Sequence, residues 1–227
     1  MIITSQGYGH YTQGLNNQDF GCETPQMVLI LDGCSGAKYS DAGVRLFAQL
    51  LSRKEDCDKE EFFEANVKST FKDIIEMSSK YYKTKDDLEN NYILENLLFT
   101  IIACFQTEDN FIVKLFGDGY IITQNKYESI SYMRFSYGQC PPYWAYKYCS
   151  EHTDFFKNYN FKKFVFDKKI FEKVAIATDG IMPAALGQLE NFDRVLKEGN
   201  EEIIKWTLNK NRQIFDDDVT IGMFGGK

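Results

Sequence analysis

The 227-residue chain lacks the features that mark membrane and secreted proteins. No apolar stretch approaches the roughly 20 residues that a membrane-spanning helix needs. The first ten residues, MIITSQGYGH, have no basic segment followed by an apolar one, which is the pattern of a secretory signal. The sequence therefore predicts a cytoplasmic protein with no membrane contact. Because a chain of this size can bury roughly 70% of its unfolded surface around one core, we expect residues 1–227 to form a single, monomeric domain.

Paired cysteine motifs are also missing. The six cysteines form no C-x-x-C motif and have no accompanying histidine spacing, which argues against a zinc module and against thioredoxin-like chemistry. The even number of cysteines does not by itself exclude disulfide bonds between them. Free buried cysteines are nevertheless common in reducing compartments, and the chain is neither short nor rich in loops. We therefore expect reduced thiols.

The chain has no excess of positive charge. It has 33 acidic and 26 basic residues, and its formal net charge is −7. This balance disfavours nucleic acid as a partner, because such binding needs a broad basic surface facing the phosphates. The pairs Lys162-Lys163 and Lys168-Lys169 are local exceptions, and such pairs usually form a solvated face.

Hydrophobic patterning predicts a mixture of strands and helices. Apolar runs closed by turn residues are typical of buried strands, and apolar residues three to four positions apart are typical of helices. The predicted strands span 27–32, 97–105, 111–116, 120–123, 174–178 and 219–224, after an edge strand near the N-terminus, and the predicted helices begin at Ser40 and span 60–78 and 191–208. Residues 134–160, rich in aromatics, are expected to be irregular apart from a short helix at 144–149. This order favours an α+β fold with helices on the outer faces of a sheet core.

Four acidic motifs stand at the ends of apolar runs. They are Asp32-Gly33, Asp118-Gly119, Asp179-Gly180 and the triplet Asp216-Asp217-Asp218. Each should project from the edge of the sheet core, where neighbouring carboxylates repel one another unless protons or hard cations intervene. The pattern therefore predicts a divalent metal site built from oxygen ligands.

Asp-Gly after a strand is also the commonest sequence of a tight hairpin turn. Asp118-Gly119 is followed by YIIT, a good partner strand, and the close spacing of this region favours antiparallel hairpins. Asp32-Gly33 and Asp179-Gly180 are followed by loops and then helical sequence, so neither makes a two-residue hairpin. The triplet, taken alone, is also compatible with a solvated turn.

Five short motifs in order identify a family that the sequence resembles. They are NNQD (16–19), LDGCSGAKYSDAG (31–43), FGDG (116–119), ATDG (177–180) and DDVT (217–220). Together they resemble the motifs of the type 2C metal-dependent Ser/Thr protein phosphatases, also called the PPM family, and the loop after Asp32 is most similar to the bacterial branch. The motifs span nearly the whole chain.

The resemblance implies a four-layer α-β-β-α sandwich of two antiparallel sheets with helices on both outer faces. It also implies a centre of two Mg²⁺ or Mn²⁺ ions. By motif matching, Asp32 would bridge both ions, the Gly33 carbonyl would complete one of them, and Asp179 and Asp217 would bind the second. Asp118 would hold a looser third ion together with Asp179, and Asp19 would order water bound to the ions.

The implied activity is hydrolysis of phosphoserine and phosphothreonine monoesters by a metal-activated water, in a signalling role paired with a Ser/Thr kinase. Two alternatives stay open: a catalytically silent phosphatase-like module that binds a partner, and a phosphohydrolase of a small metabolite. The segment around 137–148 could be a protein-docking flap or a small-molecule lid.

The sequence departs from the family pattern at three positions. Gly14 stands where family members often carry a phosphate-binding Arg, so phosphate binding would rely on the metal ions or on another donor such as His10 or Lys38. Cys34 replaces the His that eukaryotic members place after the Asp-Gly, so the general acid could be a metal-bound water, and Gln18 replaces a Glu. Cysteine-phosphatase chemistry needs a C-x5-R loop, but the sixth residue after Cys34 is Ser40, so we expect a structural thiol.

Overall fold

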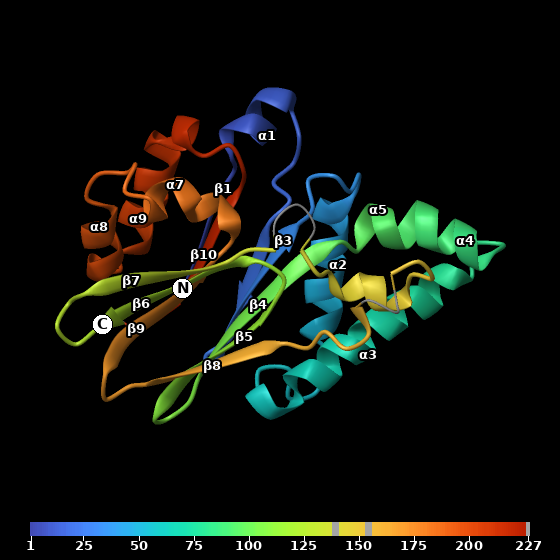
Figure 1. Ribbon diagram of the computed structural model, residues 1–227, viewed down its shortest axis with the longest axis horizontal. Coiled ribbons are helices and arrows are strands. Elements are labelled where there is room, and N and C mark those ends of the chain that lie inside the picture. The colour runs from blue at the N-terminus through green and yellow to red at the C-terminus, as the bar shows by residue number, and fades with distance from the viewer. Residues whose placement is uncertain (138–140, 153–155, 226–227) are drawn as a thin grey trace.

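The computed structural model describes residues 1–137, 141–152 and 156–225. Its described strands form two antiparallel five-stranded sheets (Figure 1). The first has the order β1 (Ile2–Ser5), β10 (Val219–Phe224), β9 (Phe171–Ala177), β6 (Gly119–Asn125), β7 (Ile130–Phe135); the second has the order β2 (Phe20–Glu23), β3 (Met27–Gly33), β4 (Phe99–Gln106), β5 (Asn110–Phe116), β8 (Lys162–Asp167). The opening strand is an edge strand, as predicted.

The helices lie on the two outer faces of this sandwich (Figure 1). The described α-helices are α1 (Tyr8–Gln13), α2 (Ser40–Leu51), α3 (Glu60–Ser79), α4 (Lys85–Leu88), α5 (Leu94–Asn96), α7 (Met182–Ala185), α8 (Phe192–Glu198) and α9 (Glu201–Lys210). A π-helical turn, η1 (Glu89–Ile93), joins α4 to α5, and 3₁₀ turns lie at η2 (Trp144–Tyr148), η3 (Asp179–Ile181) and η4 (Arg212–Ile214).

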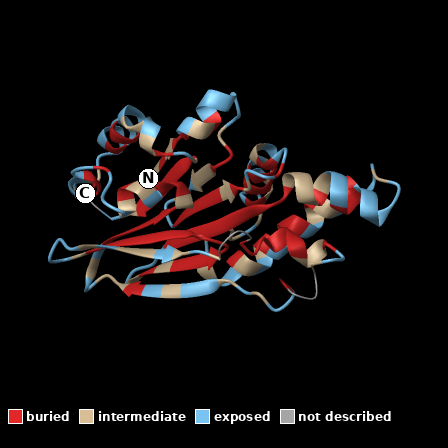
Figure 2. Ribbon diagram, turned by 45° about the horizontal axis from the view of Figure 1, so that its top comes forward, coloured by how far each residue is buried: buried red, intermediate tan, exposed pale blue. Residues whose placement is uncertain are grey.

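Three apolar clusters separate the four layers, and buried residues are concentrated on the strands between them (Figure 2). One cluster packs α2 and α3 on the second sheet, one packs α8 and α9 on the first sheet, and the third lies between the sheets. In β3, Val28 and Ile30 face the other sheet whereas Leu29 and Leu31 face the helices. Both faces are buried, which explains why this strand is a continuous apolar run without alternation. The predicted α-β-β-α sandwich is confirmed.

The predicted hairpin at Asp118-Gly119 is wrong. The strands before and after it belong to different sheets, since β5 pairs with β4 and β8, and β6 pairs with β7 and β9. Gly117 and Gly119 have φ values of 107° and 132°, which glycine adopts without the strain that other residues would suffer. A Cβ on Gly117 would lie 2.6 Å from Thr100 Cβ. The Asp-Gly pair therefore marks a crossing between sheets, with Asp118 at the crossing point.

Other predicted boundaries shift for local reasons. The helix predicted over 191–208 is two helices, because Gly199 ends α8 at φ 65° and the Asn200 side chain caps α9 by accepting the Ile203 N–H at 3.2 Å. The helix that begins at Ser40 has Tyr39 as its N-cap residue without a side-chain cap. The strand predicted over 97–105 starts at Phe99. Strands β2, β7 and β8 were not predicted.

The aromatic segment predicted to be irregular lies partly outside the described residues. Its described part contains the 3₁₀ turn η2, in agreement with the short helix expected there. Trp144 is buried, with its ring 5.0 Å from that of Phe116 and 6.4 Å from that of Phe71. This segment is thereby packed on the cluster beneath α3.

The lysine pairs are engaged in local contacts. Lys163 pairs with Glu60 at 3.0 Å, the same carboxylate that Lys114 contacts at 2.7 Å. Lys168 lies over the ring of Phe111.

Within the described residues, no helix is both long and apolar enough to cross a bilayer.

Gly43 in α2 sets how closely the helix approaches the end of α5. A Cβ at this position would lie 1.6 Å from the backbone carbonyl oxygen of Asn96, so the helix cannot accept a side chain without moving. We expect Gly43→Ala to lower the free energy of unfolding by about 1–3 kcal/mol, although alanine is the better helix former by about 1 kcal/mol. Urea unfolding followed by circular dichroism measures the change.

The neighbouring exposed position provides the control. Ala42→Gly should also be destabilising, by at most about 1 kcal/mol, because there only helix propensity changes. A Gly43→Ala variant as stable as the unmodified protein would contradict the close approach.

Candidate metal centre

One cavity brings together the predicted metal-ligand residues. It has a volume of about 180 Å³. Asp32, Gly33, Asp118, Asp179 and Asp217 all line it, together with Cys34, Ser35, Thr100, Pro141 and Tyr143. The four aspartates are separated by up to 185 positions in sequence, so only the fold makes them neighbours.

Strand ends deliver each carboxylate to this place. Asp32 is the last residue but one of β3 and lies opposite Thr100 of β4. Asp118 sits at the crossing between the sheets, and Asp179 opens η3 directly after β9. Asp217 precedes β10, which runs antiparallel to β9, so the start of one strand lies beside the end of the other. The four carboxylates therefore converge at one end of the sandwich.

The loop after Asp32 is held by backbone contacts. Cys34 N donates to Leu98 O at 2.9 Å and Tyr39 N donates to Glu95 O at 2.8 Å. A Cβ on Gly33 would lie 2.7 Å from Gln18 O and 2.9 Å from Ser40 Oγ. Only glycine fits at this crowded position, which is also where the family motif requires it.

Burial and mutual repulsion raise the pKa values of these carboxyl groups. Burial is the largest cause for Asp32, whose pKa is raised well above its usual range, and the charges of Asp19 and Asp179 add to it. Burial and the charge of Asp179 raise the pKa of Asp118 to about 6. Burial likewise raises the pKa of Asp179 and of Asp217. The cavity is therefore a place where positive charge is strongly favoured.

The donor set fits two hard divalent ions. Every side chain among the predicted ligands offers carboxylate oxygens, which suit Mg²⁺ and Mn²⁺. Thr100 Oγ1 is buried beside the cavity and has no hydrogen-bond partner among the described residues, as expected where a bound ion or its water would complete the site.

Asp19 lies behind the cavity. It is buried, and its Oδ2 accepts a hydrogen bond from Thr178 Oγ1 at 2.8 Å. Thr178 Oγ1 in turn accepts the Thr220 N–H at 2.9 Å. Burial first, and then the charges of Asp218 and Asp217, raise its pKa. The charge of Asp19 raises the pKa of Asp32, although Asp19 does not line the cavity.

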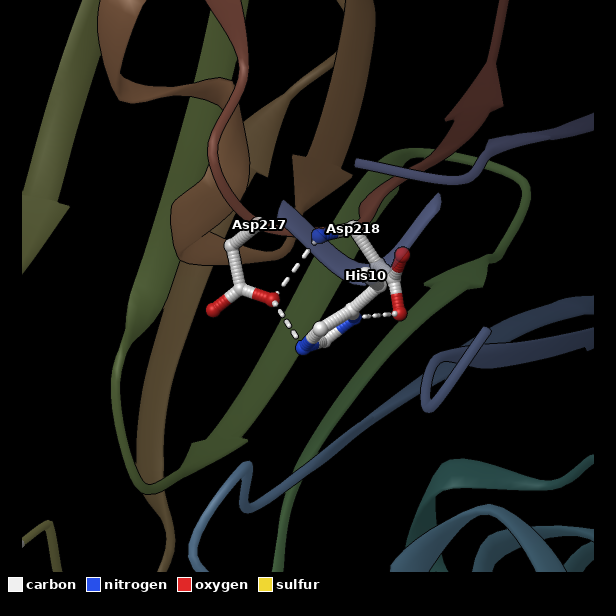
Figure 3. A group of neighbouring side chains, drawn as sticks. All are labelled: His10, Asp217 and Asp218. Carbon is white, nitrogen blue, oxygen red and sulfur yellow. Dashed lines mark hydrogen bonds and ion pairs between the residues drawn. The ribbon is translucent and has the colours of Figure 1, made fainter. Parts of the chain in front are cut away.

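Asp218 has a structural role that sequence reasoning did not separate from that of its neighbours. Its carboxylate accepts the Gly7 N–H at 2.8 Å and the Gln18 N–H at 2.7 Å, and Oδ2 lies 2.8 Å from Nδ1 of His10 (Figure 3). It thus holds the N-terminal segment on the start of β10. In the sequence, the one sign of this role is that Asp218 directly precedes the apolar run that forms β10.

The two substitute phosphate donors have other contacts. His10 is buried in α1 against Asp218, and Lys38 lies over the ring of Tyr39 at 5.0 Å. Neither is among the described residues that line the cavity. Gly14 ends α1 at φ 68°, a conformation that an arginine would adopt only under strain.

Arg134 is a nearby cation that sequence reasoning missed. It lies opposite Tyr120 across the β6–β7 pair, and Tyr120 lies opposite Ala177, two residues before Asp179. Its positive charge counteracts the rise in the pKa values of Asp118 and Asp179. No local motif marks it, because the sheet register brings it to the site.

A second cavity in the structure is larger than the one that holds the aspartates. An open groove of about 690 Å³ lies near the start of α3 and the β4–β5 turn. Among its acidic residues, Glu60 is already paired with Lys114 and Lys163. The smaller cavity is the candidate site because it gathers the predicted ligands, and within the described residues no lysine or arginine forms an ion pair with its four carboxylates.

Comparison with known proteins agrees with this geometry. The family model described as protein phosphatase 2C matches residues 6–210. The chain therefore belongs to the protein phosphatase 2C family, which confirms the resemblance found in the motifs. No curated protein gives a significant match.

Solved structures show the same fold at low sequence identity. A bacterial serine phosphatase is 16% identical with a TM-score of 0.66, and the match covers 100% of this chain and 98% of that one. The Ser/Thr phosphatase Stp1 from Staphylococcus aureus is 15% identical with a TM-score of 0.63, covering 100% and 94%. The catalytic domain of the Ser/Thr phosphatase PstP, solved with two manganese ions, is 12% identical with a TM-score of 0.63, covering 98% and 95%.

Raised carboxyl pKa values predict an unusual pH dependence for the metal-free protein. A group with a higher pKa in the folded state binds protons more tightly when folded, so the folded state gains stability as pH falls. For Asp118 the window runs from its ordinary value of 3.8 to about 6. We expect the free energy of unfolding in EDTA to fall between pH 4 and pH 6, by about 2 kcal/mol from Asp118 alone. Chemical unfolding at each pH measures it.

Two controls connect this slope to the cavity. Asp118→Asn should flatten the slope, because the amide does not titrate, and millimolar Mn²⁺ should restore stability at pH 7 by binding the folded state. Stability that rises with pH in EDTA would contradict the crowded cavity.

Proposed function

We propose that this chain hydrolyses phosphoserine and phosphothreonine in proteins, with two divalent ions held in the cavity at the end of the sandwich. The observation that carries this proposal is that Asp32, Gly33, Asp118, Asp179 and Asp217 line the same cavity. Membership of the protein phosphatase 2C family supports the class of reaction.

Each aspartate is given the role that motif matching implied. Asp32 would be shared by the two ions, and the Gly33 carbonyl would complete the binding of one of them. Asp179 and Asp217 would hold the second ion, and Asp118 together with Asp179 would hold a third. Asp19, hydrogen-bonded to Thr178, would order water bound to the ions. When bound, Mg²⁺ or Mn²⁺ ions supply a water of lowered pKa as nucleophile and neutralise the phosphate.

The protein groups around the carboxylates control hydrogen bonding in the cavity. Burial, followed by a hydrogen bond with Cys34, raises the pKa of Tyr143, so its hydroxyl stays protonated at neutral pH. The hydroxyl uses its single hydrogen in the bond with Cys34, so Tyr143 lines the cavity without adding negative charge. Cys34 serves as a structural thiol in this arrangement, since no arginine follows it at the spacing of a cysteine phosphatase.

The biological setting is part of the same proposal. We expect a monomeric, cytoplasmic domain spanning residues 1–227, with substrates supplied by a Ser/Thr kinase. The net charge of −7 supports protein substrates over nucleic acid. The described part of the aromatic segment, which places Pro141 and Tyr143 in the cavity wall, would meet the substrate first.

Hydrolysis of para-nitrophenyl phosphate and of a phosphothreonine peptide tests the function. We expect turnover with Mn²⁺, none with excess EDTA, and a loss of roughly 100-fold or more in kcat for Asp32→Ala and Asp179→Asn, because each removes a metal-binding charge. Asp109→Asn is the matched control. It changes an exposed carboxylate in the β4–β5 turn, at the other end of β4 from Thr100.

The pattern of results separates the alternatives. Metal-dependent turnover of para-nitrophenyl phosphate without the peptide would favour a small phosphorylated metabolite. A folded protein that hydrolyses neither compound, even with bound Mn²⁺, would favour a silent binding module and contradict the proposal.

A further inference from the structure

The short helices α4, η1 and α5, with the two residues after them, form an arm (residues 85–98) that contacts two walls of the candidate metal centre. One wall is the 34–39 loop, which brings Cys34 and Ser35 to the cavity, and the other is the aromatic segment, which brings Pro141 and Tyr143. No residue of the arm lines the cavity itself. The arm is therefore placed to fix one wall relative to the other.

The C-terminal end of the arm holds the 34–39 loop. Glu95 accepts the Tyr39 N–H at its backbone oxygen, at 2.8 Å, and the Lys38 N–H at Oε2, at 3.2 Å. Leu98 O accepts the Cys34 N–H at 2.9 Å. All three bonds are made by the backbone of the loop, so they fix its course directly.

The N-terminal end of the arm holds the aromatic segment through one carboxylate. Glu89 opens the π-helical turn η1 and is 7% exposed. Its Oε2 accepts the Ser150 N–H at 2.9 Å, and its Oε1 accepts the Ser150 hydroxyl hydrogen at 2.8 Å. Lys85 Nζ lies 3.2 Å from Glu89 Oε1 and donates to Ser150 Oγ at 2.8 Å. Both carboxylate oxygens of Glu89 are thus used on a single residue of the segment.

Glu89 carries its negative charge at neutral pH. Burial on its own would raise the pKa of this carboxyl group, but the hydrogen bonds from Ser150 and Lys85 outweigh burial and lower the pKa. Hydrogen bonds to a charged group are roughly twice as strong as those between neutral groups. The π-helical turn that presents Glu89 is a rare conformation, and such turns are frequent at functional sites.

Packing and hydrogen bonding have different effects on the aromatic segment. Trp144 is buried against Phe116, so apolar burial keeps the segment on the protein. Burial has no preferred direction, however, whereas hydrogen bonds do. The 3₁₀ turn η2 lies between Tyr143 and Ser150. The bonds from Ser150 to Glu89 therefore determine where along the surface the segment lies, and with it where Tyr143 stands in the cavity wall.

We propose that Glu89 is a positioning residue for protein substrates, because its hold on Ser150 fixes the aromatic segment opposite the 34–39 loop. This inference rests on the proposed function in taking a phosphorylated peptide as the substrate. Glu89 does not line the cavity, so its effect reaches the reaction only through the wall that it holds. A peptide is large enough to contact that wall, whereas para-nitrophenyl phosphate has no chain on either side of its phosphate. Removal of Glu89 should therefore weaken peptide binding and spare the chemical step.

Steady-state kinetics of Glu89→Ala with Mn²⁺ test the proposal. We expect KM for a phosphothreonine peptide to rise by about 10-fold, while kcat for the peptide and both constants for para-nitrophenyl phosphate change by no more than about twofold. Glu76→Ala is the matched control, because it removes an exposed glutamate of α3 that pairs with Lys72 on the surface. It should leave all four constants unchanged.

The Ser150 hydroxyl shows whether the effect passes through this contact. Ser150→Ala should raise KM for the peptide less than Glu89→Ala does, because the Ser150 N–H can still bond to Glu89. The double variant should match Glu89→Ala alone, since the two residues act as one unit, and effects that add would overturn the inference. Ser150 is exposed, so Ser150→Ala also decides the question should the buried Glu89→Ala substitution prevent folding.

Fluorescence gives a readout that does not depend on turnover. The chain has two tryptophans, and in a Trp206→Phe background Trp144 is the one that remains. Glu89→Ala should make Trp144 easier to quench with acrylamide. An unchanged quenching constant, or an unchanged KM for the peptide, would overturn the inference and leave the phosphatase activity standing. An unmodified protein that hydrolyses neither compound would overturn the proposed function and the inference with it.

Discussion

The crowding of carboxylates at one end of the sandwich is the constraint that the rest of the structure has to meet. Asp32, Asp118, Asp179 and Asp217 line one small cavity, and Asp19 is buried behind it. Such a group destabilises a fold unless cations or protons neutralise it. The repulsion is confined to one end of the sandwich, where the strands of both sheets are tightly packed. The packed strands keep the repelling carboxylates from moving apart. The candidate metal centre therefore depends on the apolar clusters that hold these strands in place.

The sandwich converts distant sequence positions into one site because the ends of its strands meet. Strands β3, β9 and β10 deliver Asp32, Asp179 and Asp217 from their ends or starts, whereas Asp118 arrives through a crossing between sheets. That crossing needs two glycines at positive φ and a tight fit of Gly117 against Thr100. The site therefore depends on backbone conformations that only glycine adopts easily.

Much of this arrangement was predictable, and the exceptions have physical causes. Three of the aspartates were predictable because a buried strand, a carboxylate and a glycine form a local pattern, and these three motifs together with NNQD and DDVT, in order, specify the family. The sheet change at Asp118 was missed because a hairpin and a crossing begin with the same local sequence. Only the pairing of β6 with β7 and β9, in place of β5, distinguishes them. Asp218 was not separated from Asp217, since adjacent side chains near a strand point in different directions and composition does not show which one faces the cavity. Thr100, Tyr143 and Arg134 reach the site through packing or register, for which the sequence carries no local signal.

The absence of an arginine at Gly14 changes the charge balance of the centre. Four cavity carboxylates carry a formal charge of −4, which two divalent ions neutralise, but a bound phosphate dianion brings further negative charge. An arginine beside the phosphate would offset part of it. Here the nearby cation is Arg134, whose charge acts on Asp118 and Asp179, the two carboxylates assigned to a third ion. The cation that acts on the cavity carboxylates therefore lies on the side of Asp118 and Asp179.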